Sequence, residues 1–230
     1  MIIPAVSEDL RGIVRLGLVS AEPVAVGPAG AMLLSEIDAT RAELVQRHAG
    51  QTPSGIEGLE PARRLYRAFG IDPTRTRPSS EALLRRALQG KPLPQILNAV
   101  DLCNLCALRF LLPIGLYDAS SVGGDVTLRR GLPGEMYQGV RKDEVHLEGR
   151  PVLADLQGPF GNPTADSLRT AVTTTTRAIW MVIFAPASLP AAQMEAHVSQ
   201  SCEAMATHLA PPGDHVLTEG QVTGISSRTW

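Results

Sequence analysis

Residues 98–118 read NAVDLCNLCALRFLLPIGLYD, and this segment constrains the architecture more than any other part of the chain. Its first part is a mostly apolar helix. Proline and glycine at 113–115 end that helix and lead into a turn that closes at Asp118. Polar side chains on such a helix must reach water or find partners, because burying an unpaired polar group costs about 1–3 kcal/mol. Spacing of 3.6 residues per turn places four of them on or beside one face: Asn98, Asp101, Asn104 and Arg109.

Composition narrows the class of protein. The chain has 230 residues, 44% of them hydrophobic, which is enough to bury a substantial core, while aromatic residues make up only 4%. A formal net charge of −2 excludes a globally basic coat for nucleic acid. The N-terminal MIIPAVSEDLRG lacks the basic flank of a signal peptide, and the longest apolar run, 178–187, is too short to span a bilayer. We therefore expect a soluble cytoplasmic protein without a membrane partner.

The three cysteines, Cys103, Cys106 and Cys202, are an odd number, which argues against a disulfide framework. Cys103 and Cys106 form a CxxC inside the apolar helix, away from the helix N-terminus where redox pairs lie. The chain has no second cysteine pair, and its five histidines lack metal-ligand spacing. We expect buried packing cysteines, no metal and no cofactor.

The order of elements predicts an α+β fold with mixed or antiparallel sheets packed against helices. Ser79 is expected to cap the third helix. We expect residues 1–60 to belong to the same unit as a domain at 61–210, and residues 211–230 to form a C-terminal tail. Helical patterns cover 28–49, 61–69, 79–90, 96–110 and 191–209, and strand patterns cover 13–19, 126–130, 135–140, 145–147, 152–154 and 178–184.

Residues 61–91 carry a local excess of positive charge. Eight basic residues stand against only Asp72 and Glu81, a net charge of +6. Arginine suits bidentate phosphate contacts, so this segment predicts polyanion binding, although a solvated face with acidic partners from elsewhere in the chain would have the same composition. The basic residues are Arg63, Arg64, Arg67, Arg75, Arg77, Arg85, Arg86 and Lys91.

A second candidate site is the glycine-rich segment GPFGNPTADSLRT at 158–170. Gly158 and Gly161 allow backbone to approach a ligand, and the turn that starts at Asn162 carries further polar groups. Asn162, Asp166 and Ser167 are candidate site groups. Alternatively, Asp166 or Ser167 caps a short helix that follows.

The 98–118 segment resembles a stretch of the phenylalanyl-tRNA synthetase beta subunit, without a gap. The likeness continues through GGDVTLRRGLPGEMYQGV at 123–140, PVLADLQGP at 151–159 and TTRAIWMVIF at 175–184, and so spans roughly residues 95–187. The matching residues are Asn98, Asp101, Asn104, Pro113, Asp118, Arg129, Gly134, Glu135, Ala154, Asp155, Gly158 and Pro159. The resemblance implies the tRNA-binding and editing module of that subunit, which hydrolyses tyrosine wrongly attached to tRNA. Because 230 residues cannot also hold a class II synthetase core, it implies a freestanding domain and not a ligase.

Two editing residues of that family are replaced. Its histidine aligns with Gly115, and its glutamate falls near Met181, with no glutamate between 177 and 190. The resemblance therefore implies a more apolar pocket, unsuited to the tyrosine hydroxyl. Backbone amides at 158–162 would hold an oxyanion, and a tRNA hydroxyl would help position water. The implied pocket residues are Asn98, Asp101, Cys103, Pro113, Gly115, Leu116, Gly158, Phe160, Gly161, Asn162, Asp166 and Met181.

Two functions follow as hypotheses. The first is an aminoacyl-tRNA deacylase that acts in trans on a tRNA carrying an amino acid other than tyrosine. Its partner would be the aminoacylated 3′ end of tRNA, bound through the arginines of 61–91, and no side chain is assigned as catalytic. The second is a tRNA- or RNA-binding domain that has kept the fold without the chemistry.

Overall fold

The computed structural model describes residues 1–140 and 144–223. Its α-helices are α1 (Ala31–Arg47), α2 (Glu60–Ala68), α3 (Ser79–Leu88), α4 (Asn98–Phe110) and α5 (Ala191–His208). Its strands are β1 (Ala5–Val6), β2 (Val14–Glu22), β3 (Ile114–Asp118), β4 (Thr127–Arg130), β5 (Met136–Gln138), β6 (Glu144–His146), β7 (Pro151–Asp155), β8 (Gly158–Gly161), β9 (Ile179–Pro186) and β10 (Leu217–Val222).

The strands form one antiparallel sheet, one mixed sheet and a small hairpin. The antiparallel sheet has the order β10-β2-β9-β3, the mixed sheet has the order β1-β4-β7-β8, and β5 pairs with β6. Only the pairing of β1 with β4 is parallel among the described strands. The expected α+β class, with mixed and antiparallel sheets packed against helices, is confirmed.

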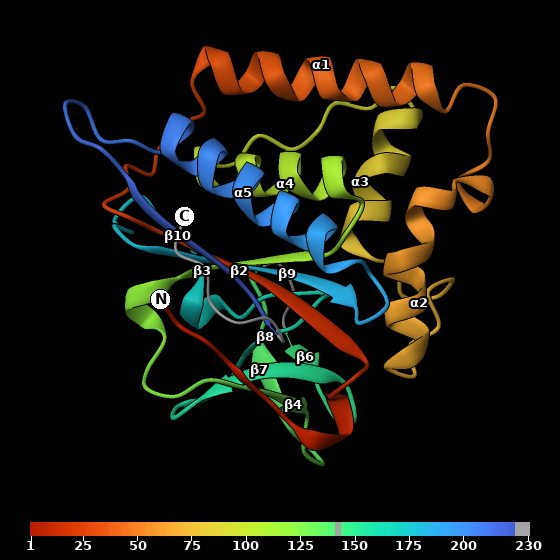
Figure 1. Ribbon diagram of the computed structural model, residues 1–230, viewed down its shortest axis with the longest axis vertical. Helices are drawn as coiled ribbons and strands as arrows, with labels where there is room; N and C mark the ends of the chain where they lie inside the picture. The colour runs from red at the N-terminus through yellow and green to blue at the C-terminus, as the bar shows by residue number, and fades with distance from the viewer. Residues whose placement is uncertain (141–143, 224–230) are drawn as a thin grey trace.

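The layers are visible in Figure 1. Helices α4 and α5 lie on one face of the β10-β2-β9-β3 sheet, α1 lies over them, and the mixed sheet lies on the other face. Strand β9 is buried along its whole length. Alternate side chains enter the two cores: Met181 and Ile183 pack toward the helices, while Trp180 and Val182 pack toward the mixed sheet. A strand covered on both faces explains the nearly continuous apolar run IWMVIF.

The segment after α4 is a strand and not the expected turn. The helix ends at Phe110, and Leu111 adopts a left-handed conformation with φ of 54°. Ile114–Asp118 then pairs with β9 as the edge strand of the antiparallel sheet. The expectation of a turn was wrong because proline and glycine here occupy an edge position, where an unpaired side of the strand tolerates them.

The C-terminal part of the chain also differs from the expectation of a tail at 211–230. Residues 217–222 form β10, which pairs with β2 from Leu217↔Glu22 to Val222↔Gly17. LTEGQV alternates too weakly to predict a strand, and pairing with β2 determines its conformation. Residues 224–230 lie outside the described part of the chain.

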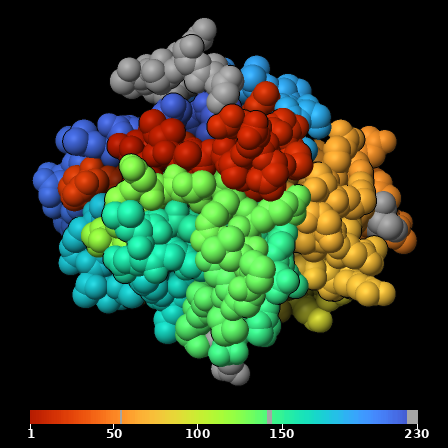
Figure 2. All heavy atoms as spheres, turned by 90° about the horizontal axis from the view of Figure 1, so that it is seen from below, coloured from red at the N-terminus to blue at the C-terminus, as the bar shows by residue number. Residues whose placement is uncertain are grey.

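The N-terminal residues are integral to the fold. Strand β2 lies between β10 and β9, and β1 pairs with β4 of the mixed sheet. Figure 2 shows the red N-terminal segment running across the molecular surface beside the green segments of the mixed sheet. At α3 the capping residue is Pro78, so Ser79 is the first helical residue and its side chain does not cap the helix.

Candidate functional site

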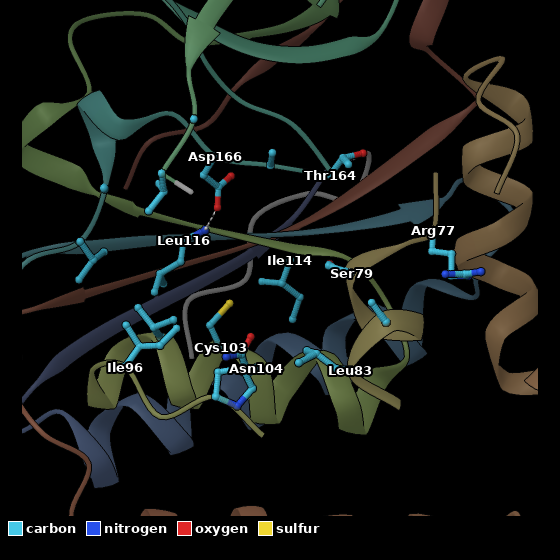
Figure 3. Close-up of a pocket in the computed structure, with 18 of the residues that line it drawn as sticks. Arg77, Ser79, Leu83, Ile96, Cys103, Asn104, Ile114, Leu116, Thr164 and Asp166 are labelled. Atoms are coloured by element: carbon cyan, nitrogen blue, oxygen red, sulfur yellow. Dashed lines mark hydrogen bonds between the residues drawn. The ribbon is translucent and has the colours of Figure 1, made fainter. Parts of the chain in front are cut away.

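One large cavity lies between the helical layer and the exposed edge of β3. Its volume is about 870 Å³, within the usual range for small-molecule sites. Figure 3 shows Asp166 and Thr164 on one side, Cys103 and Asn104 on the helical side, and Arg77 at the far end. Its aliphatic wall consists of Leu83, Ile96, Leu97, Val100, Ile114, Leu116, Val140 and Val172.

Asp166 is held in place by the backbone on both sides of it. Its carbonyl oxygen accepts a hydrogen bond from the Val140 amide at 3.2 Å, and the residue bridges Gly161 at the end of β8. The turn before it is fixed by Asn162, whose Oδ1 accepts from the amides of Thr164 at 2.7 Å and Ala165 at 2.9 Å. Ser167 caps the following short helix, so the capping alternative holds for Ser167 and leaves Asp166 free to line the cavity.

The Asp166 carboxyl has an unusual environment. Burial raises its pKa to about 7, and the Tyr117 hydroxyl and the Leu116 amide lower it only in part. The Leu116 amide donates to Oδ2 at 3.4 Å, whereas Oδ1 is buried and has no hydrogen-bond partner of normal geometry among the described residues. A carboxyl in this position changes its charge near neutral pH. Such groups in cavities are characteristic of functional sites.

Gly115, on the edge strand β3, lies where the structure leaves no room for a side chain. A Cβ at Gly115 would lie 2.1 Å from the Tyr117 hydroxyl oxygen, and one at Gly161 would lie 2.3 Å from the same atom. Tyr117 is completely buried, packed edge-on against Phe160 at 5.2 Å between ring centroids. The two glycines therefore form the slot that holds this tyrosine.

On α4, Cys103 and Asn104 both line the cavity. Burial raises the pKa of the Cys103 thiol well above its usual range, so the thiol is neutral and a poor nucleophile at neutral pH. Cys106 faces α5 and accepts a long hydrogen bond of 3.9 Å from the Ser201 hydroxyl. Cys103 and Cys106 are both free thiols and both buried, which agrees with the prediction of buried packing cysteines. The Asn104 side chain makes no hydrogen bond within the described residues and is available to a ligand.

The arginines predicted to bind a polyanion divide into two groups. Glu81, which is buried, accepts from Arg63 at 2.8 Å and from Arg85 at 2.9 Å, so both of these arginines are structural. The solvated-face alternative also applies to Arg67, which pairs with Glu60, while Arg64 contacts Ser188. The remaining three line the cavity: Arg75, Arg77 and Arg86.

Among these three, the degree of internal pairing differs. Arg75 is highly exposed and lies 3.6 Å from Asp72. The Arg86 side chain donates to the Pro92 carbonyl oxygen. Arg77 has no hydrogen bond or ion pair within the described residues. Arg77 and Arg86 therefore lack a carboxylate partner in that part of the chain and are the cations best placed to meet a ligand's phosphate.

Asn98 and Asp101, which the resemblance implied as pocket residues, do not line this cavity. Asn98 accepts from the Gly27 amide at 3.0 Å and donates to the Ala25 carbonyl at 2.9 Å. Asp101 accepts from the Ile96 amide at 2.9 Å. Both side chains hold the start of α4 against neighbouring backbone. These two members of the polar stripe on α4 therefore have partners inside the fold, whereas Asn104 lines the cavity.

The β8 segment and Met181 are also placed differently from the inferred pocket. Gly158, Phe160 and Gly161 pair with β7 or pack in the core, and the segment 158–162 does not line the cavity. Its amides are therefore not presented to this cavity. Met181 is the register partner of Leu116 but lies completely buried, one strand behind the cavity wall. Pro113 and Gly115 belong to the same edge without lining the cavity.

Of the inferred pocket residues, the structure brings Cys103, Leu116 and Asp166 together. Most of the aliphatic wall was missed, including Ile96 and Val100. Ile96 lies just before α4 and Val100 lies in its first turn, so the sequence shows both as apolar residues at the start of a helix. Periodicity alone does not separate a cavity wall from a packed core. Among the described residues, no three His, Cys, Asp or Glu side chains converge in a way that could hold a metal ion.

The fold and cavity together define an α+β domain with a largely apolar cavity whose lining includes one carboxyl group and three arginines. A family model described as the B3/4 domain matches residues 61–205, and the chain belongs to that family. This confirms the relationship to the phenylalanyl-tRNA synthetase beta subunit indicated by residues 98–118.

Among solved structures, a similar one is an N-terminal fragment of the phenylalanyl-tRNA synthetase beta-subunit from Pyrococcus horikoshii. The TM-score is 0.44 and the identity is 15%, over 89% of this chain and 48% of that fragment. The chain spans about half the length of that fragment. A comparison with curated proteins finds no match. None of the helices in the described part of the chain combines the length and apolar character needed to cross a membrane.

Proposed function

We propose that this chain is an aminoacyl-tRNA deacylase that acts in trans, and that the cavity receives the aminoacylated 3′ end of a tRNA. The observation that carries the proposal is that one cavity combines an aliphatic wall with two arginines, Arg77 and Arg86, that lack a carboxylate partner among the described residues. The arginines would contact the phosphates of the terminal nucleotides. The aliphatic wall would hold the aminoacyl side chain, and membership in the B3/4 family supports an RNA-related role.

The amino acid we propose is apolar and not tyrosine. The cavity contacts are supplied by Val100, Ile114, Leu116 and their aliphatic neighbours, and Met181 does not take part. A wall of this kind gains free energy by burying apolar ligand surface, about 25 cal/mol per Å². It does not offer a dedicated partner for a phenolic hydroxyl.

The proposed chemistry relies on positioning. The amides of Thr164 and Ala165 already donate to Asn162, and the Leu116 amide donates to Asp166, so these are not free to stabilise an oxyanion. Cys103 is neutral, and none of the residues lining the cavity is a histidine. We therefore propose that the ribose hydroxyl next to the ester positions the attacking water, and that the cavity contributes by fixing the ester beside it.

The second candidate function is RNA binding without catalysis. A domain that binds an RNA end without hydrolysis needs the arginines and the apolar wall but no oxyanion site. The occupied amides of the 162–166 turn favour this alternative.

The test is a deacylation screen with purified protein and a panel of aminoacyl-tRNAs, including leucyl, valyl, phenylalanyl and tyrosyl esters, alongside binding of the uncharged tRNAs. Accelerated hydrolysis of an aliphatic ester over the spontaneous rate is the expected result. Tight tRNA binding without hydrolysis of any ester would replace the deacylase with the RNA-binding function. Absence of both would exclude the two proposals.

A further inference from the structure

The cavity carries opposite charges in different places. In the described part of the chain, Asp166 is the one acidic residue in its lining, while Arg75, Arg77 and Arg86 are the cations. Figure 3 shows Asp166 well separated from Arg77, with Ile114 in the part of the view between them and Leu116 on the other side of Asp166. A complementary ligand carries a positive group, an apolar segment and a negative group in that order.

Asp166 lacks a counter-ion from the protein. No ion pair involves it among the described residues, and its Oδ1 is buried without a hydrogen bond of normal geometry. The titratable groups that face it are Tyr117 from β3, Tyr137 from β5 and Cys103 from α4. All three are neutral at neutral pH. A buried carboxylate without a cation is costly, so a ligand cation placed here would gain a strong partner.

We propose that Asp166 binds the α-ammonium group of the aminoacyl ligand, while Arg77 and Arg86 bind phosphate at the other end. This rests on the proposed function in taking an aminoacylated nucleotide as the ligand. An aminoacyl nucleotide carries the ammonium group and the phosphate at opposite ends of one molecule, which matches the separation of charges in the cavity. The consequence is selection: the site accepts esters with a free amino group and rejects N-acylated and peptidyl esters.

The geometry also fixes the direction of the aminoacyl side chain. With the ammonium group at Asp166, the side chain extends toward Leu116 and Ile114, which are the nearest aliphatic groups of β3. Asp166 is thus assigned to substrate recognition and not to proton removal from water.

The test uses a non-hydrolysable probe, 3′-deoxy-3′-(L-leucylamino)adenosine 5′-monophosphate, and its N-acetyl derivative. Affinities are measured by calorimetry at pH 7.5 for the wild-type protein and Asp166→Asn, with Asp125→Asn as a control because Asp125 is exposed and does not line the cavity. N-acetylation and Asp166→Asn should each weaken binding at least tenfold. The Asp166→Asn variant should bind the N-acetyl probe almost as well as the free amine, because the substitution and the acetylation remove the same interaction.

Three outcomes would overturn the proposal: equal wild-type affinity for both probes, unchanged affinity of Asp166→Asn for the free amine, or no binding of either probe. Hydrolysis of aminoacyl-tRNA is measured separately. Amine-dependent binding without any hydrolysis would sustain this inference and remove the deacylase. Loss of hydrolysis in Asp166→Asn with unchanged probe affinity would assign Asp166 as a base and overturn the recognition role.

Discussion

The amide of Leu116 donates a hydrogen bond to Asp166 Oδ2 at 3.4 Å, across 50 residues of sequence. This interaction joins the exposed edge of β3 to the turn after β8, and both residues line the cavity. The structure thus uses the unpaired side of an edge strand to hold a carboxyl group at a ligand site. Covering an edge in this way also removes an amide that would otherwise be open to pairing with another chain.

Replacing Asp166 should make the fold more stable at neutral and alkaline pH. Its pKa is raised from 3.8 to about 7 in the folded protein, so the folded protein binds this proton more tightly than the unfolded chain does. Its contribution to stability is fully present below about pH 4 and is lost as pH rises to about 7. Asp166→Asn has no such loss. Its free energy of unfolding relative to wild type should therefore rise by roughly 2–4 kcal/mol as the pH is raised from 4 to 8.

Urea unfolding at pH 4.5, 6 and 8 measures this difference, with the exposed Asp125→Asn as the matched control. A gain that is the same at every pH would show that Asp166 is not the titrating group. A stabilising substitution that also weakens ligand binding is the pattern expected when a functional group is retained at a cost in stability.

Gly115→Ala should destabilise the protein by about 1–3 kcal/mol, because the added Cβ would lie 2.1 Å from the hydroxyl oxygen of the buried Tyr117. Gly30→Ala is the control, since its Cβ would meet nothing within 4 Å and its φ is −74°. Thermal unfolding compares the two. Equal stability of both variants would mean that Tyr117 moves freely. Gly115→His is expected to cost more stability than Gly115→Ala, because the larger side chain meets the same buried tyrosine.

The architecture was largely predictable where a segment carries its own periodic signal. Strand β9 was recognised from IWMVIF because a strand covered on both faces is apolar throughout, and α5 from the spacing of Met194, Val198 and Met205. Strands β3, β8 and β10 were not recognised. They contain proline or glycine or alternate weakly, and their conformation depends on pairing with distant strands that no local pattern reveals.

The candidate site was predictable only in part, for a related reason. Turn chemistry around Asn162 singled out Asp166, which lines the cavity, while the resemblance implied a pocket position for Met181, which does not line it. Periodicity placed Asn98 and Asp101 on one helical face, but it does not say whether that face meets solvent, a cavity or backbone. The number of arginines in 61–91 likewise did not reveal that Glu81 holds two of them.

Asn98→Ala should lower stability by about 1–3 kcal/mol, because it leaves the Gly27 amide and the Ala25 carbonyl without their side-chain partner. Probe affinity of the folded fraction should stay within twofold of wild type, since Asn98 does not line the cavity. Asn104→Ala is the matched comparison, as the same residue type one and a half turns later on α4 does line it. A large loss of affinity in Asn98→Ala with normal stability would return it to the ligand site.

Changing Arg77 and Arg86 together to Glu should weaken tRNA binding and reduce the dependence of log K on log salt by about 0.7 for each single-strand phosphate interaction that the change removes. The control is Arg11→Glu with Arg47→Glu, which makes the same change in net charge at exposed positions away from the cavity. Filter binding between 50 and 300 mM salt gives both quantities. The same weakening in both double variants would indicate a nonspecific effect of net charge.

The final prediction concerns the choice of amino acid. The aliphatic wall of Val100, Ile114 and Leu116 should favour leucyl and phenylalanyl esters over tyrosyl esters, because a buried phenolic hydroxyl there would lack a dedicated partner. An apolar pocket rejects an added hydroxyl by only about 100-fold at most, so tyrosyl hydrolysis should be reduced and not abolished. Initial rates at limiting substrate give kcat/KM for each ester. Leu116→Asn should narrow the phenylalanyl-to-tyrosyl ratio by providing a polar partner, with Met181→Leu as the control behind the wall. A wild-type preference for the tyrosyl ester would show that another surface selects the amino acid.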